Sequence, residues 1–202
     1  MIAIDTAHGE ARVHVHEAEG ATAAVVLGHG AGGGVGAPDL EAARDAALAQ
    51  DVTVALVEQP YRVAGRKSSP PADKLDTAWI AVMEHLAGSD LAGLRLITGG
   101  RSAGARVACR TAAVTGAAAV LCLAFPLQPP ARKGNEPRPS RLDELEAVPL
   151  PMLIVQGVSD QFGMPPEDER WTLVTVAGNH SLRSDLPAVA AAVGEWLPAV
   201  RG

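Results

Sequence analysis

Ser102 lies in the pentapeptide Gly100-Arg101-Ser102-Ala103-Gly104, directly after an apolar run. A G-x-S-x-G pattern between a strand and a helix is typical of a nucleophile elbow, a strained turn that exposes the serine hydroxyl at the end of a sheet. The glycines leave room for the neighbouring backbone in such a turn. A chain rich in glycine and alanine also produces this pattern by chance, as an ordinary loop with an exposed serine. The pentapeptide alone leaves both interpretations open.

Two further polar residues, Asp160 and His180, follow strand-like runs later in the chain. A serine nucleophile needs a base within hydrogen-bond reach and a carboxylate that orients the base. Ser102, Asp160 and His180 occur in the required order, each just past a different strand. Glu167 and Asp168 lie further from the strand end and are weaker candidates for the carboxylate. Alone, Asp160 is typical of a turn and His180 of an exposed or capping position. Together with Ser102 they predict a catalytic triad.

A glycine-rich loop at residues 28–36 follows an earlier apolar run. Such a loop brings backbone amides close to a ligand, and an oxyanion hole takes one amide from it and one from the residue after the nucleophile. We therefore expect the N–H groups of Ala31, with Gly32 as second choice, and of Ala103 to form the hole. His29 is expected to support the loop by hydrogen bonding rather than to act as a base.

The same loop offers a competing interpretation, because residues 28–33 fit G-x-G-x-x-G and Glu58 ends the next strand. That arrangement is typical of a dinucleotide site in which the acidic residue binds the ribose. The helix of such a site opens within the glycine motif, whereas here Pro38 is the predicted first helical residue. This alternative also leaves Ser102, Asp160 and His180 without a role.

The elements that would position these residues alternate along the chain. Residues 1–18 predict a β-hairpin, and near-continuous apolar runs then alternate with helical patterns, as in a parallel sheet covered on both faces. We expect one α/β domain spanning residues 1–202, with about eight strands and an antiparallel start. The predicted strands after the hairpin are 23–27, 52–57, 94–98, 118–125, 151–156 and 171–176, and the predicted helices are 38–50, 73–86, 102–114, 140–147 and 186–200.

Composition excludes several classes of function. Aromatic residues make up 3% of the chain and its net charge is -6, which argues against a nucleic-acid surface built on stacking or phosphate contacts. No run reaches the length of a membrane span and the start lacks a secretory pattern, so we expect a cytoplasmic protein.

Cys109 and Cys122 are interpreted as buried free thiols. Neither a metal nor an organic cofactor is expected, and His14 and His16 are interpreted as surface residues of a strand.

Six segments spread over nearly the whole chain carry a family resemblance: residues 28–34, 60–66, 99–104, 125–130, 156–163 and 178–181. On these segments the chain resembles the small, cap-less α/β-hydrolases of the dienelactone-hydrolase-like kind. It is also similar to bacterial relatives of testis-expressed hydrolase-like proteins and of an NSL-type chromatin-complex subunit. The resemblance implies an α/β-hydrolase fold without a cap domain and a serine hydrolase acting on ester, thioester or related acyl bonds.

Individual residues are candidates for lining the substrate pocket. Phe125 and Gln128 stand where Tyr and His are common in the family, and both are candidates for the pocket wall, as is the proline-rich stretch 126–149. Tyr61, Arg66 and Arg101 are further candidates, together with His29 and Gly32. Arg101 could attract an anionic substrate or pair with a carboxylate, and we favour the pairing.

A second hypothesis comes from another class of protein. Some relatives act as protein-interaction subunits, so the chain could be a hydrolase-fold interaction module without catalysis, because a fold does not establish an activity. The complete set Ser102, Asp160 and His180 argues against this. We expect a small-molecule acyl substrate, no nucleic-acid or membrane partner, and a monomer or homodimer.

Overall fold

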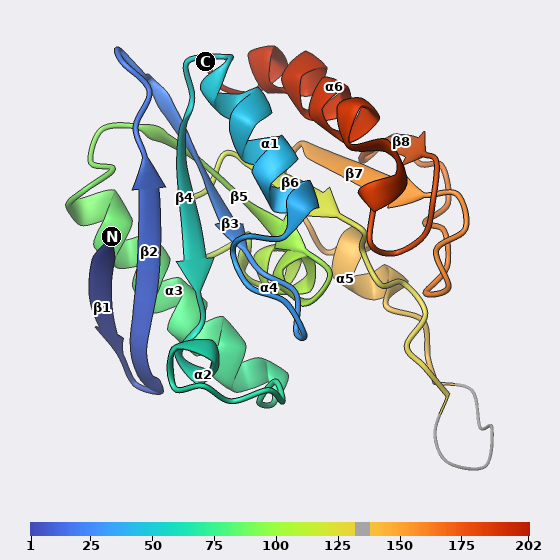
Figure 1. The fold of residues 1–202 in the computed structure, drawn as a ribbon, viewed down its shortest axis with the longest axis horizontal. Coiled ribbons are helices and arrows are strands. Elements are labelled where there is room, and N and C mark those ends of the chain that lie inside the picture. Colours follow the sequence, from blue (N-terminus) through green and yellow to red (C-terminus); the bar gives the residue numbers. More distant parts are fainter. Residues whose placement is uncertain (132–137) are drawn as a thin grey trace.

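A computed structural model describes residues 1–131 and 138–202, and its eight strands form one sheet (Figure 1). The strand order is β1-β2-β4-β3-β5-β6-β7-β8. The hairpin strands β1 and β2 pair antiparallel, β2 pairs antiparallel with β4, and every later pairing is parallel. The strands are β1 (Ile2–Thr6), β2 (Gly9–His16), β3 (Ala23–Gly28), β4 (Thr53–Glu58), β5 (Arg95–Arg101), β6 (Ala119–Leu123), β7 (Met152–Gly157) and β8 (Thr172–Val176).

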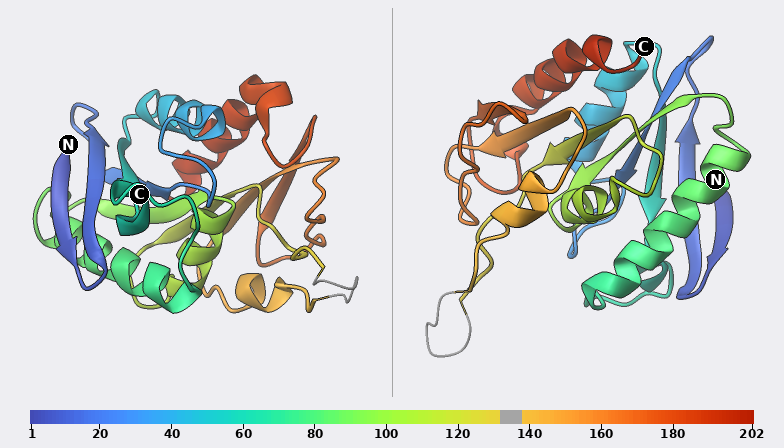
Figure 2. Two further views of the ribbon diagram at one scale, coloured as in Figure 1. Left: turned by 60° about the horizontal axis from the view of Figure 1, so that its bottom comes forward. Right: turned by 180° about the vertical axis from the view of Figure 1, so that it is seen from behind.

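Helices cover both faces of this sheet (Figure 2). On one face α1 (Pro38–Leu48) packs against α6 (Leu186–Trp196). On the other face α3 (Ala72–Gly88) contacts α4 (Ala103–Thr111), which in turn contacts the short α5 (Leu142–Glu146). The remaining elements are α2 (Pro60–Val63) and two 3₁₀ turns, η1 (Arg183–Asp185) and η2 (Leu197–Ala199).

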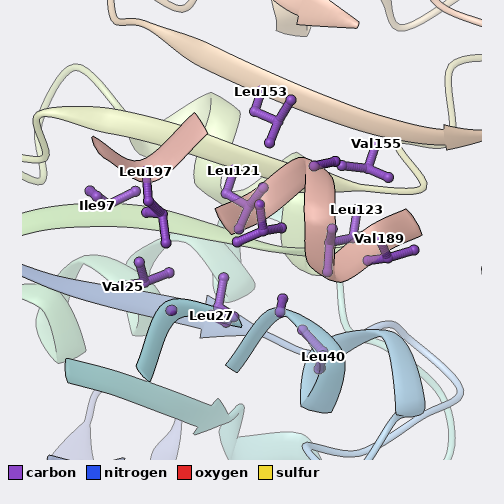
Figure 3. Packing of buried hydrophobic residues seen from close by; sticks show 14 of the residues in the cluster. Val25, Leu27, Leu40, Ile97, Leu121, Leu123, Leu153, Val155, Val189 and Leu197 are labelled. Carbon is purple, nitrogen blue, oxygen red and sulfur yellow. The ribbon is translucent and has the colours of Figure 1, made fainter. Parts of the chain in front are cut away.

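The central strand β3 is buried along its whole length, because successive side chains enter opposite cores. Val25 and Leu27 face α1 and α6, where they pack in one cluster with Leu40 and Val189 (Figure 3). Val26 belongs to a second cluster, which the residues of α3 complete. Burying an aliphatic side chain of this size contributes about 1.5–3 kcal/mol, so this double burial fixes the register of β3 at the centre of the sheet.

The predicted α/β architecture of about eight strands, with its antiparallel start and helices on both faces, is confirmed. Several predicted ends differ. The last helix stops at Trp196 and continues as η2, which contains Pro198. The stretch 60–63, expected as loop, forms α2 with Pro60 at its first turn, where a missing amide costs nothing. The proline-rich stretch 126–149 includes residues 132–137, which lie outside the described part. Within the described residues, no helix combines the length and the apolar character that a membrane span requires.

Candidate active site

Ser102 occupies the sharp turn between β5 and α4. Its φ of 52° and ψ of -107° are a strained backbone conformation for a residue other than glycine. The Ser102 amide donates to the carbonyl of Leu123, at 2.9 Å. A side chain on Gly104 would run into the Gly28 carbonyl, and one on Gly100 would approach the same oxygen to 2.5 Å. The pattern glycines therefore let the end of β3 pack against the turn, as the nucleophile-elbow interpretation requires.

The three predicted triad residues lie together. His180 Nε2 is 2.9 Å from Ser102 Oγ, and His180 Nδ1 is 2.8 Å from Asp160 Oδ2. The Asp160 side chain is fully buried, while that of His180 is 12% exposed. With Nδ1–H donating to the carboxylate, Nε2 is the nitrogen that can accept the serine proton. The arrangement can thus remove a proton from Ser102 and hold the resulting imidazolium against Asp160.

Asp160 is itself held by groups that the sequence analysis did not single out. The Gln156 side-chain amide donates to Asp160 Oδ2 at 2.9 Å, and the Phe162 backbone amide donates to Oδ1 at 2.8 Å. The Phe162 ring stands edge-on to the His180 imidazole, with centroids 4.5 Å apart. Gln156 lies at the end of β7 and also donates to the carbonyls of Phe125 and Gly163. Both ends of the Asp160–His180 pair are therefore fixed in orientation.

The loop after β3 is tied down at three points. His29 Nδ1–H donates to the Gly30 carbonyl at 2.8 Å, and His29 Nε2 accepts from the Gln59 amide at 3.1 Å. Burial lowers the pKa of His29, which favours this neutral form. The Tyr61 hydroxyl donates to the Ala31 carbonyl at 3.1 Å. The side chains of His29 and Tyr61 therefore hold the loop in place through these hydrogen bonds to the backbone.

Ala31, Ser102 and Ala103 line one cavity of about 300 Å³. Ala103 is the first residue of α4, where the amide has no partner within the helix. Among the described residues, neither the Ala31 nor the Ala103 amide donates to another group. These two N–H groups are the ones predicted for the oxyanion hole. The remaining residues of the cavity wall are Ser69, Pro70, Ala72, Leu75, Arg106, Arg110, Pro126, Pro130, Arg141 and Phe162.

The three arginines of this wall were missed by the sequence analysis. Arg106 and Arg110 follow Ser102 at spacings of four and eight residues, which place them on one side of a helix and could have indicated their position. Arg141 comes from a different part of the chain, just before α5. No pattern in the sequence brings Arg141 to Ser102, because only the path of the chain through 126–149 does so.

Several expected pocket residues lie elsewhere. The Phe125 ring is fully buried in the core cluster around α4 and α5, which corrects its expected place at the pocket wall. Arg66 and Tyr61 line a separate cavity of about 500 Å³ on the α2 side. Gln128 is exposed and donates to the Arg138 carbonyl at 2.7 Å. Gly32 is exposed on its loop and, like His29, is absent from the residues that line the Ser102 cavity.

Arg101, next to Ser102, pairs with a carboxylate. Its Nε donates to Asp39 Oδ2 at 2.7 Å, and its Nη2 donates to the His180 carbonyl at 3.2 Å. Asp39 lies in the first turn of α1 and is 1% exposed. Burial raises the pKa of Asp39, and the Arg101 charge opposes that shift. The guanidinium of Arg101 therefore links α1 to the backbone of His180, as the favoured pairing interpretation expects.

The structure also shows where the residues considered for a dinucleotide site, a metal site and a cysteine pair lie. Glu58, the ribose ligand of the dinucleotide interpretation, lies 3.1 Å from His14 Nε2, and α1 begins only at Pro38, beyond the glycines. Within the described ranges, no group of three His, Cys, Asp or Glu side chains is arranged to hold a metal ion. Cys109 and Cys122 are buried and free, with their sulfurs 3.4 Å apart.

Comparison with known proteins gives one family and many similar folds. The family described as "Alpha/beta hydrolase domain" matches residues 21–185. No curated protein matches. Among solved structures, Est1E from Butyrivibrio proteoclasticus has a TM-score of 0.80 at 16% identity, over 98% of this chain and 97% of that one.

Two further structures have the same fold. A serine hydrolase without a lid from Xanthomonas campestris has a TM-score of 0.74 at 19% identity, over 98% of this chain and 93% of that one. A dienelactone hydrolase from Anabaena variabilis has a TM-score of 0.78 at 17% identity, over 100% of this chain and 97% of that one. At these identities the likeness establishes the fold alone.

Proposed function

Because the chain belongs to the alpha/beta hydrolase domain family, we propose that it is a serine hydrolase that cleaves an ester, thioester or related acyl bond. The observation that carries the proposal is the hydrogen-bonded series from Ser102 through His180 to Asp160. Its geometry is that of nucleophile, base and orienting carboxylate. Solved structures with the same fold include an esterase from Pyrococcus furiosus and the dienelactone hydrolase from Anabaena variabilis, which supports the same class of reaction.

In the first half of the reaction Ser102 Oγ attacks the carbonyl carbon while His180 Nε2 takes the hydroxyl proton. The carbonyl oxygen becomes an oxyanion, for which the Ala31 and Ala103 amides are the donors. A single such donor is worth about 10²- to 10³-fold in kcat. His180 then returns the proton to the leaving group as the tetrahedral intermediate collapses to an acyl-Ser102 ester.

In the second half a water molecule attacks the acyl-Ser102 carbonyl, again with His180 as the base. The proton passes to Ser102 Oγ when the acid is released, so the enzyme returns to its starting state. Asp160 keeps the His180 ring in the required tautomer throughout and stays ionised. We place this activity on a small-molecule acyl substrate in the cytoplasm, without a cofactor, and in a monomer or homodimer.

Turnover of short p-nitrophenyl esters tests the proposal. The wild-type protein should show hydrolysis that falls by about 10³-fold or more in Ser102→Ala and in His180→Ala, because each variant loses one member of the unit. Ser181→Ala, which removes a half-buried hydroxyl that donates to Asn179, is a matched control and should keep wild-type rates. Equal rates in the wild type and in Ser102→Ala would instead favour the non-catalytic interaction module.

A further inference from the structure

One wall of the Ser102 cavity carries a concentration of positive charge. Arg106 and Arg110 project from α4, and Arg141 joins them from the start of α5, which packs beside α4 (Figure 2). Ser102, Arg106 and Arg110 are spaced by four residues, so the two arginines follow the nucleophile along one side of the helix. At a rise of about 1.5 Å per residue, they stand roughly 6 and 12 Å beyond Ser102 along the helix axis.

The two arginines of α4 are held by carboxylates. Arg106 donates through Nε to Glu144 Oε2 at 2.8 Å and through Nη2 to the other oxygen. Arg110 donates through Nη2 and Nε to Asp76 at 2.6 and 2.8 Å, and its Nη1 is 3.4 Å from Glu144. Neither Glu144 nor Asp76 is among the residues that line the cavity. The two guanidinium groups are thus fixed in place by carboxylates that do not line the cavity.

Arg141 has a different set of neighbours. Its Nη1 donates to the neutral carbonyl of Pro126 at 2.7 Å, and no carboxylate in the described parts of the chain lies within 4 Å of it. Burial, with the repulsion of Arg106 next, lowers the pKa of Arg141 to about 10. Counting the described residues alone, the wall therefore holds three guanidinium groups against two carboxylates, and Arg141 gains most from an added anion.

We propose that this arginine wall binds an anionic group on the acyl part of the substrate, with Arg141 as the principal contact. The inference rests on the proposed hydrolase activity and names its substrate class: an ester or thioester of a short dicarboxylic acid, or of an acid with a comparable second anion. The acyl part is assigned to the wall because the cavity joins Ser102 and the two oxyanion amides to the arginines. His180, which protonates the leaving group, does not line it.

The bound anion takes no part in bond formation. The Ser102 Oγ–acyl bond forms, the bond to the leaving group breaks, and the leaving group departs with the proton that His180 carried. Water then cleaves the acyl-enzyme and releases the dicarboxylic acid. The arginine wall holds the free carboxylate during both steps, which positions the reacting carbonyl over Ser102 and raises the fraction of productive complexes.

Two p-nitrophenyl esters test the inference: the half ester of adipic acid, and the neutral 5-carbamoylpentanoate of the same length. We expect wild type to prefer the adipate ester. Arg141→Gln should lower kcat/KM on that ester by about tenfold to a hundredfold, mainly through KM, and change the neutral ester less than about twofold. Arg141→Lys should keep part of the preference. Arg12→Gln, which alters an exposed residue of β2 with the same change in net charge, is the matched control.

The outcomes separate the inference from the proposed function. Hydrolysis of the neutral ester with no preference for the adipate ester, or an equal loss on both esters in Arg141→Gln, overturns the anion site and leaves the hydrolase intact. If neither ester is turned over, the hydrolase proposal fails, and calorimetric titration of Ser102→Ala with adipate decides the anion site alone. Binding that weakens on adding Arg141→Gln supports the site, and absence of binding overturns it.

Discussion

Arg101→Met isolates the buried ion pair beside the nucleophile. Asp39 is 1% exposed and the Arg101 side chain 18% exposed, so solvent screens their 2.7 Å contact little. Removing one partner of a buried pair costs about 3–5 kcal/mol. Because Asp39 can take up a proton once Arg101 is gone, we expect the lower end, about 3 kcal/mol at pH 7. The double variant Asp39→Asn/Arg101→Met buries no lone charge and should recover about 2 kcal/mol of that loss.

Urea unfolding of the wild type, both single variants and the double variant measures this coupling. The pH dependence provides a second readout. Without Arg101, the pKa of folded Asp39 lies further above the unfolded value, so the folded state binds more protons between the two values. The deficit of Arg101→Met relative to wild type should therefore shrink as the pH falls from 7 towards 5, by at most about 1.4 kcal/mol per unit. Additive single losses and a deficit independent of pH would refute the coupling.

Three further changes have expected outcomes. Gly104→Ala sets a methyl group against the Gly28 carbonyl, so we expect ester hydrolysis to be abolished and the melting temperature to fall, and unchanged activity would contradict the elbow geometry. Burial lowers the pKa of His29 in the folded protein, so the unfolded state binds more protons than the folded state below pH 6.5. The free energy of unfolding should therefore fall as the pH drops through that value. Urea unfolding of His29→Gln should show a smaller fall, and a fall of the wild-type size would show that His29 does not cause it. Phe125→Ala should lower the free energy of unfolding by about 3–5 kcal/mol in the same assay, because the ring is buried in the core. Unchanged stability together with a raised KM in ester hydrolysis would instead indicate that the ring lies at the pocket wall.

The sequence predicts most of the fold and the three triad positions because their signals are local. Apolar runs mark the strands, and the glycines around Ser102 mark the turn. Parallel strands end at one edge of a sheet, so residues just past β5, β7 and β8 are brought together without further information. Ser102, Asp160 and His180 accordingly lie within hydrogen-bond distance, while their catalytic roles stay a prediction.

The remainder depends on tertiary geometry. Phe125 follows Ala124, whose φ of 50° turns the chain at the end of β6 and sends the ring into the core, which no residue pattern indicates. Gln156 reaches Asp160 only because the loop after β7 folds back on itself. Arg141 meets the cavity through the course of a long proline-rich connection. The three triad residues just past strand ends were therefore predicted, whereas Gln156 and Arg141, whose contacts depend on how loops fold, were missed.

Covalent labelling of Ser102 tests the central claim most directly. Intact-protein mass spectrometry after treatment with a fluorophosphonate should show one adduct on the wild-type chain, which peptide mapping assigns to Ser102. The adduct should be absent from Ser102→Ala and should form more slowly in Asp160→Asn, where the His180 ring loses its orienting carboxylate. A folded wild-type protein that stays unlabelled, or equal labelling of Ser102→Ala, would contradict the account.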